Sequence, residues 1–124
     1  MIVLDTCVLI AFADPANIFH AESQRILATT EPLAITALSG AELMVHPSQD
    51  QSRQWRGMLR KLAINVFPIT EDDMESIADT RRESGLKMPD ALVLWLARTH
   101  EAAVASFDQR LLDRAGQLGV AIVR

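Results

Sequence analysis

The chain has 124 residues, enough for one compact domain with a single core over residues 1–124. Hydrophobic residues make up 49% and charged residues 23%, as in an ordinary soluble globular protein, and no low-complexity tract, flexible linker or internal repeat interrupts it. The net charge of −4 argues at first against a nucleic-acid partner, but if four acidic residues bind metal the remaining acidic and basic residues balance at twelve each.

The predicted elements alternate between short apolar runs and segments with helical periodicity. In the first half we expect a strand at 2–4, helices at 8–13 and 19–28, a strand at 33–36, a helix at 37–46 and a helix that Asp50 caps. In the second half we expect a strand at 64–69, a helix from a capping-box-like start at Thr70 to about Ser84, a helix from Pro89 to His100, a strand at 102–106, a helix at 109–117 and a strand at 120–123.

The expected strands are apolar throughout instead of alternating between apolar and polar residues, and helices intervene between them. That pattern is typical of a parallel sheet covered on both faces. The sequence therefore predicts a three-layer α/β/α domain, and it does not by itself define the order of the strands.

Neither long apolar run has the form of a targeting or membrane segment. Residues 1–13 are interrupted by Asp5 and have no basic segment before them, which argues against a secretory signal. Residues 91–97 are too few to span a bilayer. The single cysteine, Cys7, cannot form an internal disulfide, which suits a reducing compartment. We expect a cytoplasmic protein with no membrane partner.

Four acidic residues stand alone as charged side chains within apolar stretches of the chain. These are Asp5, Glu42, Asp90 and Asp108. A charge within an apolar run tends to be drawn toward the interior, where an ionised carboxylate is costly unless it is paired or binds a metal.

Each of the four also has a structural interpretation. Asp5 and Asp108 end strands and could cap the helices that follow. Asp90 comes directly after Pro89 and could be a first-turn acid favoured by the helix dipole. Glu42 lies three residues after Ser39, which is the spacing of a capping box.

Considered together, the four acids favour a shared site. Ligand sites in parallel α/β sheets form beyond the carboxyl ends of the strands, where Asp5 and Asp108 are placed, and helix starts such as Asp90 open onto the same edge. Oxygen ligands suit Mg²⁺ or Mn²⁺ better than zinc. Such ions promote phosphodiester hydrolysis by activating water and neutralising the leaving oxygen. We therefore expect a metal site that hydrolyses phosphodiester bonds.

Four segments resemble the PIN-domain nucleases and, within them, the VapC-type toxins of toxin–antitoxin pairs. They are 2–6 (IVLDT), 41–43 (AEL), 89–92 (PDAL) and 105–108 (ASFD), in this order in a short chain. The resemblance implies a sheet in the order 3-2-1-4-5 and a Mg²⁺- or Mn²⁺-dependent endoribonuclease whose catalytic metal ligands are the four acids. It also implies an RNA substrate, a homodimer and a cognate VapB-like antitoxin that blocks the active site.

Two positions depart from the family pattern. Cys7 stands where the family often has Asn or Ser, and Phe107 stands where a polar Asn commonly precedes the last acid. Neither departure removes a metal ligand, but both alter the hydrogen bonds around the ligands. Thr6 and Ser106 keep hydroxyls beside Asp5 and Asp108, either as partners of those acids or as ordinary strand-end or capping hydroxyls. We interpret Cys7 as a small buried residue, since no histidine adjoins it in sequence.

Basic and aromatic side chains offer further candidates for RNA contact. Lys87 and Arg110 adjoin Asp90 and Asp108 in sequence, so they are either phosphate contacts or surface charges. Trp55 and Trp95 lie in apolar helical patterns, which favours the core over a base-stacking role.

Three other functions compete with the nuclease hypothesis. A small phosphohydrolase with Asp5 as nucleophile would need a second acid two positions on, where Cys7 stands. A receiver domain would need adjacent acids after the first strand. A non-catalytic PIN-fold binding module fits poorly with the presence of all four acids.

Overall fold

The computed structural model describes residues 1–45 and 49–123. Its strands are β1 (Ile2–Leu4), β2 (Leu33–Thr36), β3 (Asn65–Phe67) and β4 (Ala103–Ala105). Its helices are α1 (Thr6–Ala13), α2 (His20–Leu27), α3 (Ala37–Leu43), α4 (Gln49–Lys61), α5 (Met74–Ser84), α6 (Met88–Thr99) and α7 (Gln109–Gln117), and a 3₁₀ turn, η1 (Glu71–Asp73), precedes α5. None of the helices described is both long and apolar enough for a membrane span.

The four strands form one parallel sheet in the order β3-β2-β1-β4. At its β4 edge, Val104 makes a single parallel bridge to Ile122, supported by two backbone hydrogen bonds of 2.9 Å. This bridge occupies the place of a fifth strand, so the arrangement agrees with the expected order 3-2-1-4-5. The predicted strand at 120–123 is therefore reduced to one bridge.

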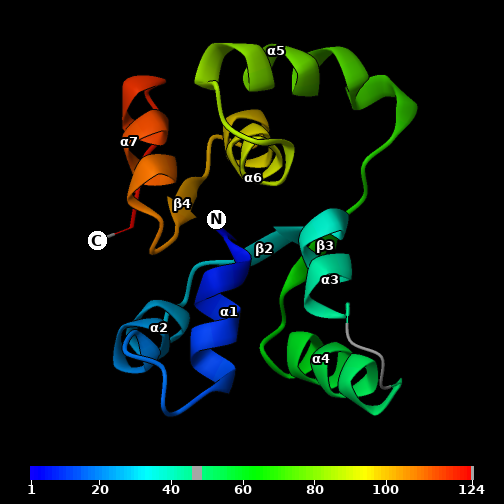
Figure 1. Cartoon of the computed structure of the whole chain (residues 1–124), viewed down its shortest axis with the longest axis vertical. Helices are drawn as coiled ribbons and strands as arrows, with labels where there is room; N and C mark the ends of the chain where they lie inside the picture. Colours follow the sequence, from blue (N-terminus) through cyan, green and yellow to red (C-terminus); the bar gives the residue numbers. More distant parts are fainter. Residues whose placement is uncertain (46–48, 124) are drawn as a thin grey trace.

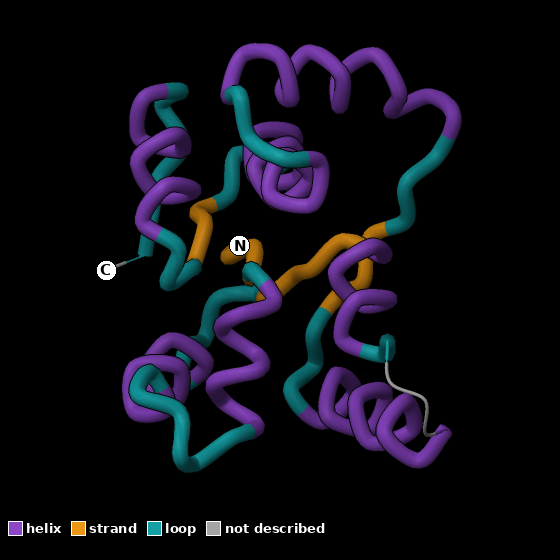
Figure 2. The backbone as a smooth tube through the Cα atoms, in the orientation of Figure 1, coloured by secondary structure: helices purple, strands orange, loops and turns teal. Residues whose placement is uncertain are grey.

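Helices cover both faces of the sheet, as Figure 1 shows and as the tube in Figure 2 makes clearer. On one face, Val3 and Val104 pack with the buried side chains of α5, α6 and α7. On the other face, Ile2 and Leu4 pack with those of α1, α2, α3 and α4. Neighbouring residues of β1 thus enter opposite cores, because side chains alternate across a strand. This explains the absence of polar residues in the strand and confirms the three-layer α/β/α prediction.

Helix α3 begins one residue after a buried threonine. Thr36, which is 1% exposed, caps the helix by accepting a 3.0 Å hydrogen bond from the backbone N–H of Ser39. Glu42 therefore lies at the far end of α3, and the capping-box interpretation of Glu42 is wrong. The helix also ends at Leu43, before the predicted limit of His46, which lies outside the described residues.

Two other helix starts were predicted from capping residues. Asp50 already lies within α4, so it is not the N-cap of that helix. The capping box at Thr70 is present: the carboxylate of Asp73 accepts hydrogen bonds of 2.8 Å from the Thr70 backbone N–H and 3.2 Å from its hydroxyl. This start leads through η1 into α5. The strand predicted at 64–69 shortens to β3, at the edge of the sheet and before Pro68.

The turn between α5 and α6 depends on a glycine. Gly85 ends α5 in the left-handed region, with φ of 67°, and its N–H bonds to the carbonyl of Arg81 at 3.0 Å. Leu86, directly after it, is 1% exposed and packs in the core shared by α5, α6 and α7. A residue that adopts this conformation without strain is needed to bring α6, and with it Asp90, back onto the sheet.

Substitution of two glycines by alanine should change stability in opposite directions. Gly85→Ala should lower the free energy of unfolding by about 1 kcal/mol, because alanine is strained at positive φ. Gly57→Ala should raise it by roughly 0.5–1 kcal/mol, since Gly57 lies within α4 and a new Cβ would meet open space. Urea denaturation of both variants tests this, and a change of the same sign in both would contradict it.

Candidate active site

The carboxyl ends of β1 and β4 lie side by side at one edge of the sheet. Leu4 pairs with Ala105, and the next backbone N–H, that of Asp5, donates to the carbonyl of Ala105 at 2.9 Å. Asp5 therefore leaves the sheet beside the segment that carries Ser106 and Asp108. The order of the strands thus brings together two acids that are about a hundred residues apart in sequence.

An open cavity of about 500 Å³ lies at this edge, and three of the four predicted acids line it: Asp5, Asp90 and Asp108. Asp5 follows β1, Asp90 lies in the first turn of α6, and Asp108 follows β4. Glu42, near the end of α3, is exposed and lies outside this lining, although its charge acts on Asp90. The expectation that all four acids are drawn inward holds fully for Asp5 and in part for Asp90, whereas Asp108 is exposed.

Asp5 is only 8% exposed, and side-chain donors surround its carboxylate. The hydroxyl of Ser106 donates to Oδ2 at 2.7 Å, and the thiol of Cys7 donates to the same oxygen at 3.4 Å. The hydroxyl of Thr6 lies 3.5 Å from Oδ1, at the limit of a hydrogen bond. Asp5 begins α1 but makes no side-chain capping bond, so the capping interpretation fails for this residue.

Asp108 does cap its helix. Its Oδ1 accepts hydrogen bonds from the backbone N–H groups of Arg110 at 2.9 Å and Leu111 at 3.4 Å. The backbone N–H of Asp108 donates in turn to the hydroxyl of Ser106 at 2.9 Å. Ser106 thus joins Asp5 to the backbone of Asp108, so the hydroxyl fixes the spacing between these two acids.

Like charges and burial act on the remaining two acids. Burial raises the pKa of Asp90 above its ordinary value of 3.8, and the charges of Asp5, Asp108 and Glu42 raise it further, while Lys87 partly offsets them. Although Glu42 is exposed, partial desolvation by its neighbours raises the pKa of this carboxyl, with a smaller contribution from the charge of Asp5. Negative charge is therefore unfavourable on Asp90 and Glu42, and the charge of Asp5 acts on both.

The chemistry of these groups fits a hard divalent cation, because all four are carboxylates and they repel one another. In the described part of the chain, however, no group of three or more histidine, cysteine or acidic side chains is arranged so that it could hold a metal ion as it stands. One oxygen of Asp108 is engaged in capping and Asp5 is held by Ser106. A cation bound by these acids would therefore require side-chain adjustment, and among the residues described Asp90 and Glu42 are the two acids without such a hydrogen bond.

Two cationic side chains flank the acids. Lys87 and Arg110 line a smaller cavity of about 190 Å³ together with Asp90 and Asp108. The guanidinium of Arg110 donates to the carbonyl of Gly85 at 3.2 Å, which connects α7 to the turn before α6. The structure thus places both predicted phosphate contacts beside the acids.

Several lining residues were not predicted from the sequence. Asn17 and Phe19 come from the loop between α1 and α2, where the Asn17 side chain accepts a 2.8 Å hydrogen bond from the backbone N–H of Phe19. Ile10 and Phe107 contribute apolar surface. No charge or motif distinguishes the loop residues in sequence; only the contact of α1 with α2 brings them here.

Cys7 is half-buried, and its thiol remains protonated at neutral pH. Burial raises the pKa of Cys7 from 9.0 to about 11, and the negative charge of Asp5 contributes in the same direction. Because the thiolate is the reactive form of cysteine, the raised pKa argues against a nucleophilic role at neutral pH. The prediction of a small buried residue thus holds only in part, because Cys7 is half-buried, and its thiol also makes a hydrogen bond to Asp5.

The raised pKa of Asp90 predicts a pH-dependent contribution to stability in metal-free protein. A folded state with a raised carboxyl pKa binds protons more tightly than the unfolded chain. The contribution of Asp90 is therefore fully favourable below its ordinary pKa of 3.8 and is lost as the pH rises through the folded-state value. In EDTA, Asp90→Asn should thus be stabilised relative to wild type at neutral pH, and this difference should shrink on acidification.

Urea denaturation of wild type and Asp90→Asn from about pH 7 down to about pH 4 measures that difference, since the ordinary pKa of aspartate is about 3.9. Asp72→Asn, an exposed acid in η1 outside the cavity, is the control and should follow the wild-type profile. Parallel profiles for wild type and Asp90→Asn would contradict the electrostatic description of the site.

Solved structures with the same fold include proteins of toxin–antitoxin systems. A chain in a toxin–antitoxin complex from Klebsiella pneumoniae is 27% identical, with 100% of this chain and 97% of that chain covered and a TM-score of 0.76. VapC20 from Mycobacterium tuberculosis, a toxin that cleaves the sarcin–ricin loop, is 16% identical, with 100% and 99% covered and a TM-score of 0.74. FitAcB from Neisseria gonorrhoeae is 19% identical, with 100% and 97% covered and a TM-score of 0.72.

No curated protein matches this sequence significantly. The model of one protein family, the PIN domain, matches residues 2–117, which is nearly the whole chain. The parallel sheet, its strand order and the two helical layers agree with that match. The chain therefore belongs to the PIN-domain family.

Proposed function

We propose that this protein is a divalent-metal-dependent endoribonuclease that acts as the toxin of a toxin–antitoxin pair. The observation that carries the proposal is the meeting of Asp5, Asp90 and Asp108, from three separate segments, in one open cavity at the carboxyl edge of the sheet. Membership of the PIN-domain family supports a nuclease, and the likeness to the Klebsiella pneumoniae toxin–antitoxin complex supports the toxin role.

Asp5, Asp90, Asp108 and Glu42 would hold Mg²⁺ or Mn²⁺ in this cavity. The ion, when bound, supplies positive charge that favours ionisation of the attacking water and neutralises the leaving oxygen. Ser106 keeps Asp5 oriented through its 2.7 Å hydrogen bond, and Thr6 lies on the other side of the same carboxylate. A carboxylate held in this way loses little conformational freedom when it binds an ion.

Lys87 and Arg110 would bind the phosphates of the RNA next to the bond that is cut. They line the small cavity that Asp90 and Asp108 also line, so a phosphate there lies directly beside the acids. Arg110 is oriented by its bond to the carbonyl of Gly85. Their positive charge offsets the repulsion between a polyanionic substrate and the acidic cavity.

The partner in this proposal is a cognate VapB-like antitoxin that blocks the site in a homodimeric toxin. A cavity lined by three acids is a suitable target for a basic side chain of the antitoxin. Exposed apolar residues beside the cavity, Ile10 and Phe19, offer the contact area that such a segment requires. The antitoxin would then inhibit RNA cleavage because its basic side chain occupies the positions of the metal ion and the RNA phosphate.

RNA cleavage should depend on divalent metal and on each acid. Purified protein incubated with structured RNAs should cleave in Mn²⁺ or Mg²⁺ and lose activity in EDTA. Asp5→Asn, Asp90→Asn, Asp108→Asn and Glu42→Gln should each fold normally and lose more than about tenfold of the activity, or about 1.4 kcal/mol of barrier. Asp108→Asn is informative because asparagine keeps the helix cap and loses the charge.

Asp72→Asn serves as the matched control and should cleave like wild type, since Asp72 lies outside the cavity. Products should carry 5′-phosphate and 3′-hydroxyl ends, as expected of metal-activated water. Undiminished cleavage in chelator, or products with a 2′,3′-cyclic phosphate, would rule out the proposed mechanism.

Co-expression with the neighbouring reading frame should relieve toxicity and yield a complex that does not cleave RNA. An Arg or Lys side chain of the partner should reach the carboxylates, so addition of Mn²⁺ should stabilise the free toxin more than the complex. Differential scanning fluorimetry with and without Mn²⁺ measures this stabilisation for the free toxin and for the complex. A stable complex that cleaves RNA as fast as the free protein would refute this mode of inhibition.

A further inference from the structure

Phe19 and Phe107 form a stacked aromatic pair between the candidate active site and a second cavity. Their ring centroids lie 4.4 Å apart and their planes differ by 9°. Both rings line the acidic cavity of about 500 Å³ and also a larger open cavity of about 670 Å³ on the other side. Phe19, just before α2, is 39% exposed, so the pair presents aromatic surface to solvent.

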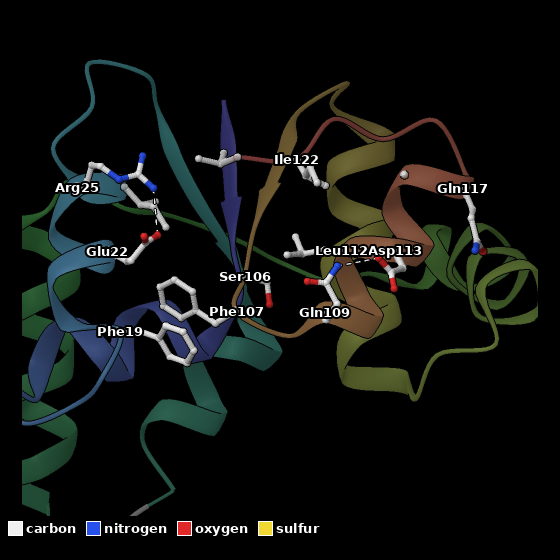
Figure 3. Close-up of a pocket in the computed structure, with 13 residues that line it drawn as sticks. Phe19, Glu22, Arg25, Ser106, Phe107, Gln109, Leu112, Asp113, Gln117 and Ile122 are labelled. Carbon is white, nitrogen blue, oxygen red and sulfur yellow. Dashed lines mark hydrogen bonds and ion pairs between the residues drawn. The ribbon is translucent and has the colours of Figure 1, made fainter.

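The larger cavity lies between α2 and α7, as Figure 3 shows, with the two rings together below Ser106. Its apolar lining includes Ile26, Leu112 and Ile122. Its polar groups include Gln109 and Gln117 from α7, the hydroxyl of Ser106, Arg25 and two carboxylates. Glu22 pairs with Arg25 at 3.1 Å, and Asp113 accepts a 2.7 Å hydrogen bond from Gln109.

This combination favours a neutral planar ring over a phosphate. Two carboxylates against one arginine make the cavity unfavourable for an anion. Amide and carboxylate side chains are the groups that bond the donors and acceptors on base edges. Nearly parallel aromatic rings provide a surface on which an unpaired base stacks. The volume lies in the range of about 300–1,000 Å³ that is common for ligand cavities.

We propose that Phe19 and Phe107 form a stacking platform for an unpaired nucleobase of the RNA substrate, near the phosphate that Lys87 and Arg110 bind beside the acidic cavity. This inference rests on the proposed nuclease function and adds a base-binding subsite to it. Both rings line the two cavities, which sets the geometry of the proposal. The phosphate would lie beside Asp90 and Asp108, and the base would lie on the side of α2 and α7.

The tryptophans do not compete for this role. Trp95 is 4% exposed, and its indole N–H donates to the hydroxyl of Ser76 at 2.9 Å, which confirms its place in the core. Trp55, in α4, is half-buried and packs against the core on the face of the sheet that α1, α2, α3 and α4 cover.

Fluorescence of a short single-stranded RNA that contains one 2-aminopurine tests the platform. Stacking quenches this base, so wild-type protein in Ca²⁺ should quench it, with the RNA recovered intact as a check. Phe19→Leu should abolish the quenching and weaken binding about 5- to 150-fold, the effect expected for loss of one stacked base. In Mn²⁺, the same variant should raise KM for RNA cleavage by a similar factor.

Phe12→Leu is the matched control, because Phe12 also stacks on a neighbouring ring, that of His20, but lines neither cavity. It should quench, bind and cleave as wild type does. Phe19 is chosen in preference to Phe107 because Phe107 packs against the core, whereas Phe19 is exposed.

The outcomes separate this inference from the proposed function. Cleavage in Mn²⁺ with the same KM for Phe19→Leu and wild type leaves the nuclease standing and overturns the platform. Absence of quenching by wild type also overturns it. If Phe19→Leu weakens only the complex with the antitoxin, the rings are a protein-docking surface and the inference is wrong. Quenching that depends on Phe19 without any metal-dependent cleavage supports the base subsite and overturns the nuclease proposal.

Discussion

The carboxylate of Asp5 is buried at the end of β1, where it accepts a 2.7 Å hydrogen bond from Ser106, and the other parts of the site are arranged around this contact. Burial of an ionised group is costly unless donors or a cation compensate. Ser106 is positioned because β4 pairs directly with β1, and it passes the constraint on to Asp108 through the backbone N–H of that residue. One hydroxyl therefore sets the spacing of two acids.

The remaining acids, Asp90 and Glu42, come from helices, and negative charge on them is unfavourable in this site. Asp90 and Glu42 both have raised pKa values, caused first by burial and then by neighbouring carboxylates. Metal-free protein keeps this repulsion because the strands and caps hold the backbone in place. Stability is thereby given up for a site that a divalent cation and the flanking Lys87 and Arg110 would neutralise.

The acidic cavity and the cavity between α2 and α7 meet at the Phe19–Phe107 pair. The acidic cavity offers carboxylates for an ion, with Lys87 and Arg110 in the small cavity beside it for phosphate; the cavity between α2 and α7 offers aromatic surface and amide groups. A single-stranded nucleic acid has the same two aspects, a charged backbone and planar bases. The two cavities, which share these rings, therefore match the two parts of a single-stranded nucleic acid and fit one continuous binding region.

The sequence by itself determined the layers of this fold and the acids of its edge. Strands without polar residues require two covered faces, and isolated acids such as Asp5 and Asp90 in apolar runs stand out because burial of charge is costly. It could not tell which strand-end acid makes capping bonds: Asp108 caps α7, whereas Asp5, also at a strand end, does not cap α1. Nor could it find Asn17 and Phe19, since nothing in their local sequence is unusual. The tertiary structure decided which acid caps a helix and which loop residues line the cavity. Both depend on contacts between segments far apart in sequence, which local propensity and periodicity do not encode.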